Sequence, residues 1–269
     1  MKNQAEGGPR RTGRRFRFQF SVFLDVNSDE SRVNAPGALA DGEIHVWVFG
    51  LDAPPEKISA LAATLSADER ERAGQYRFGQ LRERFTVGRG RLRAVLGGYL
   101  ARAPADLEFG YTARGKPTLK DEGIHFNLAH SDDLALLAVT RVAPVGVDLE
   151  RIRRMPDAVA IAKRFFARRE VAALADLPAA AQDEGFFNLW TRKEAWLKAT
   201  GDGITASLAK VEFTFRPGER ARVVAIDGDA GAAAGWSLFT LQPAAGFVGA
   251  LAIHATEVEV TQRKLKTES

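Results

Sequence analysis

Residues 190–198 read "WTRKEAWLK" and follow the apolar stretch "GFFNLW". The spacing predicts a helix in which Trp190, Glu194 and Lys198 lie four residues apart on one face. One interpretation is an ordinary amphipathic helix, stabilised by a salt bridge from Glu194 to Lys198 worth a few tenths of a kcal/mol. The other interpretation is the wall of an active site. Features elsewhere in the chain are needed to choose between them.

A second acidic motif, "GVDLE", spans residues 146–150. Its alternation predicts a strand in which Asp148 and Glu150 point to the same side, while Leu149 points into the core. Two adjacent carboxylates raise the pKa of one of them unless a cation lies between them. The simpler alternative is a solvated strand end, because carboxylates are common at protein surfaces.

With Glu194, the two motifs supply three carboxylates, the kind of oxygen ligands that suit Mg²⁺. Basic groups near predicted turns, namely Arg72, Lys116 and His130, would complement a polyphosphate ligand. Taken individually, each of them fits an ordinary surface residue better. The chain has no phosphate-binding loop and no dinucleotide fingerprint, since "GRGRLR" (88–93) lies within a helical pattern.

Composition narrows the class of protein. A chain of 269 residues with 45% apolar content suits one large domain or two domains of roughly 100–130 residues. The absence of cysteine excludes disulfides and zinc–thiolate sites. No two of the four histidines have metal-ligand spacing, which leaves an oxygen-ligated Mg²⁺ or Ca²⁺ site open.

The positive charge is concentrated at the start of the chain. Residues 1–20 contain six basic residues and one acidic residue, a net charge of +5, whereas the whole chain carries +4. The remaining residues therefore sum to −1, and nucleic-acid binding is not expected of the folded body. No apolar run reaches the ~18 residues of a membrane span, and no signal peptide is evident. We therefore expect a cytoplasmic protein without a membrane anchor.

A strand–helices–strands pattern occurs twice along the chain, which predicts an α+β fold of two similar lobes with a site between them. The expected division is an N-terminal extension at 1–41 that is disordered, an N-terminal lobe at 42–144, a C-terminal lobe at 145–258 and a tail at 259–269. Within the first lobe, Ser66 is the expected N-cap of a helix, with Glu69 at the capping-box position.

Five motifs in this order resemble the Sfp-type 4′-phosphopantetheinyl transferases. The resemblance spans about residues 43–255, and "WTRKEAWLK" has the W-x-x-K-E-A-x-x-K form of one branch of that family. The motifs are "RGKPTL" (114–119), "FNLAHSDDLALLAV" (126–139), "GVDLE" (146–150), "KRFFARRE" (163–170) and "LWTRKEAWLKATGDGI" (189–204).

The resemblance implies a pseudo-dimer of two α+β lobes that binds coenzyme A between them. Asp148 and Glu150 match the family's metal carboxylates. Glu194 matches the third carboxylate, which is a Mg²⁺ ligand, a general base or both, with Mn²⁺ as an alternative metal. Lys198 matches a lysine at the pyrophosphate. The matches to coenzyme A-binding positions are Arg72, Arg89, Lys116 and His130.

The implied reaction transfers 4′-phosphopantetheine from coenzyme A to a serine of an acyl or peptidyl carrier protein and releases 3′,5′-ADP. The alternative is an inactive relative that binds carriers or nucleotides. Two departures from the family pattern concern nucleotide contacts: Ala129 replaces a frequent serine, and Glu69 replaces a lysine found in some relatives. The pathway served, whether fatty acid, polyketide or nonribosomal peptide synthesis, is left open, and a monomer is the simplest expectation.

Overall fold

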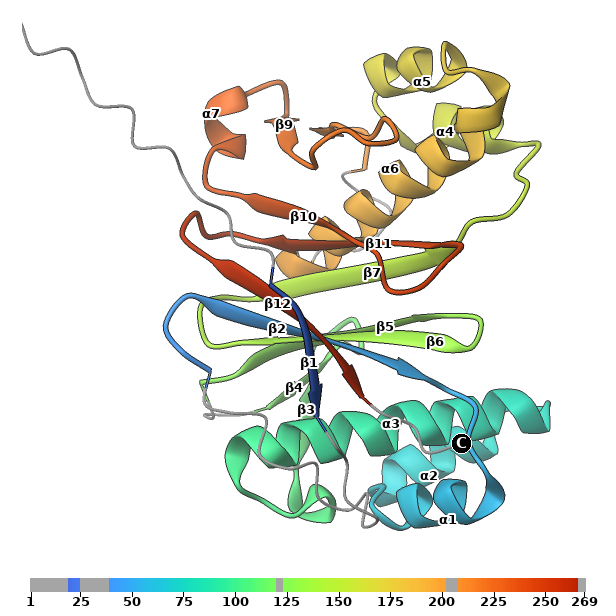
Figure 1. Ribbon diagram of the computed structural model, residues 1–269, viewed down its shortest axis with the longest axis vertical. Coiled ribbons are helices and arrows are strands. Elements are labelled where there is room, and N and C mark those ends of the chain that lie inside the picture. Colours follow the sequence, from blue (N-terminus) through green and yellow to red (C-terminus); the bar gives the residue numbers. More distant parts are fainter. Residues whose placement is uncertain (1–18, 25–38, 120–122, 202–207, 266–269) are drawn as a thin grey trace, which may run out of the picture.

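The computed structural model describes residues 19–24, 39–119, 123–201 and 208–265. These residues form four stacked layers: a long helix, a sheet, a second sheet and another long helix (Figure 1). Each long helix and the sheet beside it form one lobe. The two sheets face one another in the middle, where the lobes meet.

The N-terminal lobe carries its helices on the outer face of its sheet. The long helix α3 lies against the sheet, with α1 and α2 beside it (Figure 1). Its elements are β2 (Glu43–Gly50), α1 (Pro55–Ala63), α2 (Ala67–Gly74), α3 (Gly79–Leu100), the 3₁₀ helix η1 (Pro104–Asp106), β3 (Phe109–Tyr111), β4 (Pro117–Leu119), β5 (His125–Ser131) and β6 (Leu134–Thr140).

The C-terminal lobe has the same plan. Its long helix α6 lies on the outer face of its sheet, with α4 and α5 near its start (Figure 1). Its elements are β7 (Val145–Arg151), α4 (Ala158–Phe165), α5 (Arg168–Ala175), α6 (Ala179–Thr200), β8 (Val211–Phe213), β9 (Val223–Ile226), α7 (Ala230–Ala233), β10 (Ser237–Leu241) and β11 (Phe247–Ile253).

Strand order confirms the expected pair of similar α+β lobes. The N-terminal sheet contains the run β2-β6-β5 and the C-terminal sheet runs β7-β11-β10, so in each lobe the strand before the helices pairs with the last strand of that lobe. All four of these pairings are antiparallel. The two lobes therefore share one topology.

The alternation of side chains along β2 and β7 separates three hydrophobic cores: one between α3 and its sheet, one between the two sheets and one around α6. Trp47 and Phe49 point towards α3, while Ile44, Val46 and Val48 point towards the other lobe. Across the lobe interface they meet the apolar side of the C-terminal sheet, including Val147 of β7. This leaves the opposite side of β7, which carries Asp148, facing α6.

The segment expected to be a C-terminal tail, residues 259–269, contains a strand. Residues Glu259–Leu265 form β12, which pairs in parallel with β2 and so joins the sheet of the N-terminal lobe. Val260 of β12 is buried between the lobes, and the burial of this apolar side chain stabilises the strand. After the C-terminal lobe, the chain thus rejoins the sheet of the N-terminal lobe.

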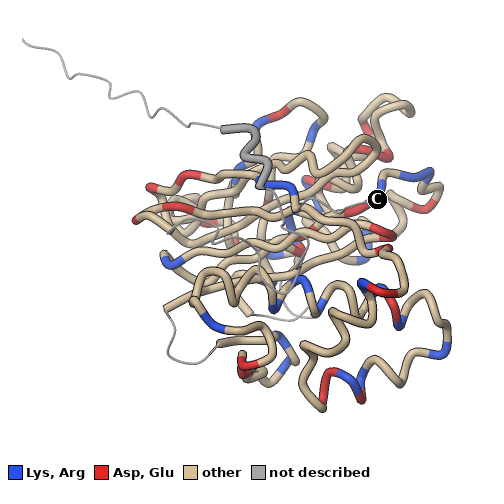
Figure 2. Tube along the Cα trace, turned by 60° about the horizontal axis from the view of Figure 1, so that its bottom comes forward, with Lys and Arg blue, Asp and Glu red and all other residues tan. Residues whose placement is uncertain are grey.

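Part of the expected N-terminal extension is also a strand. Residues Gln19–Leu24 form β1, which pairs in parallel with the outer edge of β12. The basic residues at positions 2–17 lie outside the described residues. Along the described part of the chain, basic and acidic residues are interspersed (Figure 2). None of the described helices is long and apolar enough to cross a membrane.

Candidate active site

The site is centred where the last turns of α6 cross β7. A Cβ atom added to Gly146 would lie 1.9 Å from the carbonyl oxygen of Ala195 and 2.5 Å from the backbone nitrogen of Ala199. Glycine is therefore required for this approach of helix to strand. Asp148 lies two residues after Gly146 on β7, and the same approach brings the side chain of Lys198 into contact with it.

Lys198 forms an ion pair with Asp148, since its Nζ lies 2.6 Å from Oδ1. The second carboxylate oxygen of Asp148, Oδ2, is buried without a hydrogen-bond partner. Burial raises the pKa of Asp148 to about 6, although Lys198 acts in the opposite direction. A buried carboxylate with an unused oxygen is costly for folding and is typical of a functional site.

Glu194 presents a second unused oxygen, because its Oε1 is also buried without a partner. Burial raises the pKa of Glu194, Lys198 lowers it and the charge of Glu150 raises it, which indicates that these groups share one electrostatic environment. The salt bridge expected for a plain amphipathic helix pairs Glu194 with Lys198. Lys198 instead bonds to Asp148.

Glu150 is held from the neighbouring lobe. Its Oε2 accepts a hydrogen bond of 3.0 Å from the hydroxyl of Ser131 on β5 and lies 3.3 Å from Arg153. The Ser131 hydroxyl also accepts the backbone N–H of Arg151. Four residues earlier on β5, the side-chain oxygen of Asn127 accepts the N–H of Val147 at 2.8 Å. Side chains of β5 thus link to the backbone of β7 and fix the two lobes at the site.

The acidic residues do not form a complete metal site as they stand. Among the described residues, no three acidic or histidine side chains are grouped closely enough to bind a metal ion. The unpaired oxygens of Asp148 and Glu194 nevertheless fit a hard cation, which prefers carboxylate oxygens. In the structure, the ammonium of Lys198 supplies the positive charge next to Asp148.

His130 is partly exposed, next to the buried Ser131 at the end of β5, and belongs to the same electrostatic environment. Its pKa is lowered, first by burial of the imidazole and then by the charge of Lys198, whereas Glu150 raises it. The charges of Lys198 and Glu150 therefore both act on this imidazole. This position, at the rim of the acidic cluster, suits contact with a phosphate of a bound ligand.

Lys116 reaches the same region from the turn before β4, but its ammonium bonds to the backbone. Its Nζ donates to the carbonyl oxygen of Lys198 at 2.6 Å and to that of Val145 at 3.1 Å. The contact of Lys116 with the nucleotide, which the family resemblance implies, stays a prediction. In the structure its ammonium joins the end of α6 to the start of β7.

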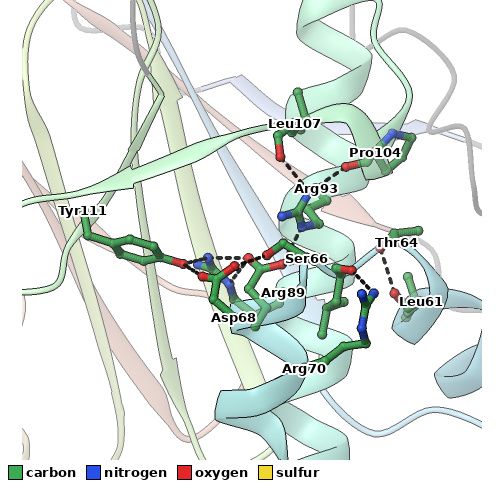
Figure 3. A network of polar contacts seen from close by, with 12 residues as sticks. Leu61, Thr64, Ser66, Asp68, Arg70, Arg89, Arg93, Pro104, Leu107 and Tyr111 are labelled. Atoms are coloured by element: carbon green, nitrogen blue, oxygen red, sulfur yellow. Dashed lines mark hydrogen bonds and ion pairs between the residues drawn. The ribbon is translucent and has the colours of Figure 1, made fainter.

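The two expected arginines lie in different surroundings. Arg72 is exposed at the end of α2, with its guanidinium 5.6 Å from the centre of the Phe85 ring. Arg89 is buried and lies 2.5 Å from Glu69 Oε1, and it also donates to the hydroxyl of Tyr111 (Figure 3). The charge of Arg89 is thus already neutralised within the lobe.

Glu69 organises this network. Its Oε2 accepts the backbone N–H of Ser66, as the capping-box pattern predicts, and it also accepts Nε of Arg93 at 2.6 Å. Arg93 then donates to the carbonyl oxygens of Pro104 and Leu107 (Figure 3). Glu69 thus ties α2 to α3.

An equivalent network in the C-terminal lobe involves residues that sequence reasoning missed. Glu170 accepts the N–H of Ala167, its Oε2 lies 2.8 Å from the ammonium of Lys193, and Lys193 also donates to the carbonyls of Leu208 and Val211. Lys193 is 1% exposed. Arg192 is also buried and donates to the carbonyl of Thr214 and the hydroxyl of Thr240. The charges on Arg192 and Lys193 are therefore structural, whereas Lys198 bonds to Asp148 of β7.

Both lobes match known families. Residues 144–252 match the profile of the 4′-phosphopantetheinyl transferase superfamily, and residues 52–142 match that of the 4′-phosphopantetheinyl transferase N-terminal region. The boundary between the two matches falls between β6 and β7, where one lobe ends and the next begins. The chain belongs to the 4′-phosphopantetheinyl transferase family.

Individual relatives support the assignment. The 4′-phosphopantetheinyl transferase HetI of a Nostoc species is 45% identical over 219 residues, which cover 80% of this chain and 89% of that protein. A putative 4′-phosphopantetheinyl transferase of a Synechocystis species is 38% identical over 169 residues, covering 62% and 68%. The transferase Sfp of Bacillus subtilis is 29% identical over 145 residues, covering 54% and 63%.

The two lobes share a topology, but their helix-facing strand surfaces differ. Strand β7 presents Gly146 and Asp148 to α6. Strand β2 instead presents His45 and Trp47 to α3, and these two side chains bond to the hydroxyl of Tyr99. The side of β7 that faces α6 thus carries a carboxylate with an unused oxygen, whereas the side of β2 that faces α3 carries a packed aromatic network. The described residues support one acidic centre in this two-lobed fold.

Proposed function

We propose that this protein transfers the 4′-phosphopantetheine group of coenzyme A to a serine of an acyl or peptidyl carrier protein and releases 3′,5′-ADP. The observation that carries the proposal is the pair of unused buried oxygens on Asp148 and Glu194 beside the ammonium of Lys198. Such a group of charges suits a pyrophosphate and a divalent cation. Family membership supplies the reaction class.

The metal-binding residues in this proposal are Asp148, Glu150 and Glu194, with Mg²⁺ as the metal and Mn²⁺ as the alternative. Bound there, the ion would supply positive charge to the phosphate oxygens in the transition state. The support is the chemistry of the carboxylates and the two oxygens without protein partners. The three side chains would have to move together to bind the ion, because they are not grouped as a metal site among the described residues.

The protein's own side chains would bind and orient the substrates. Glu194 would accept the proton of the carrier serine, directly or through a water, while it shares the metal. Lys198 would stabilise charge on the transferred phosphoryl group, and His130 would contact a phosphate of the nucleotide. Arg72 is exposed and available for a further phosphate contact, whereas Arg89 would first have to share its bond to Glu69.

A basic surface next to Glu150 is the proposed docking place for the carrier. Its residues are all exposed and extend from the end of β7 to the start of α5 (Figure 1). An acidic helical carrier would be attracted there, which mainly accelerates the encounter. The surface consists of Arg151, Arg153, Arg154, Lys163, Arg164, Arg168 and Arg169.

The alternative function, an inactive relative that binds carriers or nucleotides, finds no support in the site. A protein that only binds would gain stability by replacing Asp148, whose buried carboxylate is left partly unpaired. A cytoplasmic location and a monomeric working form are predictions that accompany the proposed reaction. The pathway of the carrier is left open.

The function is tested by incubating the protein with coenzyme A, Mg²⁺ and an apo carrier, and measuring the intact mass of the carrier. The expected result is a gain of one phosphopantetheine group, lost when a chelator removes the metal and restored by added Mg²⁺ or Mn²⁺. No mass gain on acyl and peptidyl carriers with either metal would contradict the proposal.

A further inference from the structure

Lys116 joins the two lobes at the edge of the acidic centre. It lies on the N-terminal lobe, where the turn at Gly115 leads into β4, and the backbone of the turn is closed by bonds between Thr112 and Lys116. Its Nζ donates to the carbonyl of Lys198 on α6 and to the carbonyl of Val145 on β7. One side chain thus bonds to both C-terminal-lobe elements that form the site.

The partners of this ammonium are unusual for a half-buried lysine. Among the described residues, both of its hydrogen-bond acceptors are backbone carbonyls, and burial together with the nearby charge of Lys198 lowers the pKa of Lys116 to about 8. A partly buried cation that is held by neutral carbonyls is costly, and such local costs are expected at functional sites.

The end of α6 explains what the ammonium achieves. The last carbonyls of a helix have no partners within the helix, and a positive charge is favourable at this end. Gly201, with φ of 78°, turns the chain there and donates its N–H to Leu197. Lys116 satisfies the carbonyl of the next residue, Lys198, the residue whose side chain bonds to Asp148.

We propose that Lys116 is a positioning residue for the transfer reaction. From the N-terminal lobe, its ammonium holds the last turn of α6 against the start of β7 and so sets the place of the Lys198 side chain. This inference rests on the proposed function of the site and assigns Lys116 a role other than binding the nucleotide. It explains why Lys116 contacts the backbone of the two elements that meet at Gly146.

A single residue, Lys198, connects the Lys116 tether to the acidic centre. Lys198 is the residue that both donates through its side chain to Asp148 and accepts through its carbonyl from Lys116. Loss of the tether would let the last turn of α6 fray, and a displacement near 1 Å at a reacting group costs on the order of 100-fold in rate. The loss should therefore appear in kcat.

Kinetics of Lys116→Met separate positioning from nucleotide binding when measured with coenzyme A and with 3′-dephospho-coenzyme A. Positioning predicts a fall in kcat of about 10- to 100-fold with both substrates and a KM for coenzyme A within about 3-fold of wild type. A loss that falls on KM and disappears with the dephosphorylated substrate would overturn the proposal. Arg114→Met, an exposed change in the same turn, is the matched control and should retain wild-type kinetics.

Chemical rescue removes the ambiguity of a variant that folds poorly. Because the chain has no cysteine, Lys116→Cys provides a single thiol. Its sulfur displaces bromide from 2-bromoethylamine, releases HBr and gives a lysine-like side chain. Aminoethylation should restore most of kcat, whereas alkylation with iodoacetamide, which adds a neutral amide, should not. Equal recovery with both reagents would contradict the need for an ammonium.

Amide hydrogen exchange tests the tether without relying on turnover. In Lys116→Met, exchange of the backbone amides at the end of α6, residues 197–201, should accelerate by about 10-fold or more relative to Arg114→Met. Unchanged exchange would overturn the positioning role even in an active enzyme. Faster exchange in a protein that modifies no carrier would retain the tether and refute the proposed function instead.

Discussion

The ammonium of Lys198 lies 2.6 Å from Oδ1 of Asp148, and this contact joins the last turns of α6 to the centre of β7. The other oxygen of Asp148 has no hydrogen-bond partner. The pair therefore neutralises one oxygen of a carboxylate that is only 7% exposed and leaves the second free. A carboxylate retained for packing alone would not be left in this state.

Asp148→Asn should separate function from stability. Transfer should fall below detection, because the amide cannot hold a hard cation as a carboxylate does. The thermal midpoint without metal should stay within a few degrees of wild type or rise, since the change removes a partly unpaired buried charge and Lys198 is 30% exposed and can turn to water. Calorimetry and the carrier mass assay measure the two effects. A large drop in Tm would favour a structural role for Asp148.

Gly146→Ala should damage both the fold and the site. Its Cβ would lie 1.9 Å from the carbonyl oxygen of Ala195, so α6 would have to move away from β7. We expect a loss of about 1–3 kcal/mol in the free energy of unfolding, as for overpacked cores, and a lower kcat. Gly79→Ala at the start of α3, where no atom lies within 4 Å of the added Cβ, is the control and should not destabilise the protein. Equal stability of the two variants would contradict the close approach.

Acid should weaken the fold through His45. This buried imidazole lies among Glu43 on β2, Arg263 on β12 and Tyr99 on α3. Burial first, and then the charge of Arg263, lower its pKa from 6.5 to about 4. Between those pH values the unfolded chain binds a proton that the folded protein does not, so stability is full above pH 6.5 and falls as the pH drops towards 4.

The His45 contribution to this loss is on the order of 3 kcal/mol. Denaturant unfolding at a series of pH values should show it in the wild type, and His45→Gln should have a shallower slope between pH 6.5 and 4. Other titrating groups act in both proteins and cancel in the difference. Parallel slopes would show that His45 does not titrate with folding.

Charge reversal should identify the carrier surface. The double variant Arg168→Glu and Arg169→Glu, at the start of α5, should raise the KM for an acidic carrier by about 10-fold at low salt with little change in kcat. The effect should shrink as salt screens the charges. Reversal of Lys210, which is exposed and 3.6 Å from Asp227 near the β8–β9 hairpin, serves as the control. If both reversals act alike, the basic surface has no special role.

Local patterns predicted much of the active centre. The four-residue spacing in "WTRKEAWLK" predicted Glu194 and Lys198 on one helix face, and the two-residue spacing in "GVDLE" predicted Asp148 and Glu150 on one side of a strand. That this helix and this strand meet was implied by the family resemblance. Both patterns depend on the period of a single element. The strand–helices–strands repeat likewise predicted the two lobes, which strand order then confirmed.

Contacts between distant segments were not predictable in this way. Lys193 pairs with Glu170, 23 positions earlier, and nothing in the sequence around Lys193 marks it as buried. Nothing in the sequence next to Arg89 predicts its ion pair with Glu69, 20 positions earlier. The pairing of β12 with β2 joins residues more than 200 positions apart, so the last segment resembled a tail. Tertiary packing overrides local pattern at each of these places.

The most direct test of the account is the carrier mass assay on Glu194→Gln, run beside the wild type at saturating coenzyme A and Mg²⁺. Gln keeps the size of the side chain and its place on α6 but removes the carboxylate that would share the metal and accept the serine proton. The account predicts a folded protein, with circular dichroism and Tm close to wild type, that adds no detectable phosphopantetheine to the carrier. Modification of the carrier at the wild-type rate would show that Glu194 is an ordinary helix residue and would contradict the account.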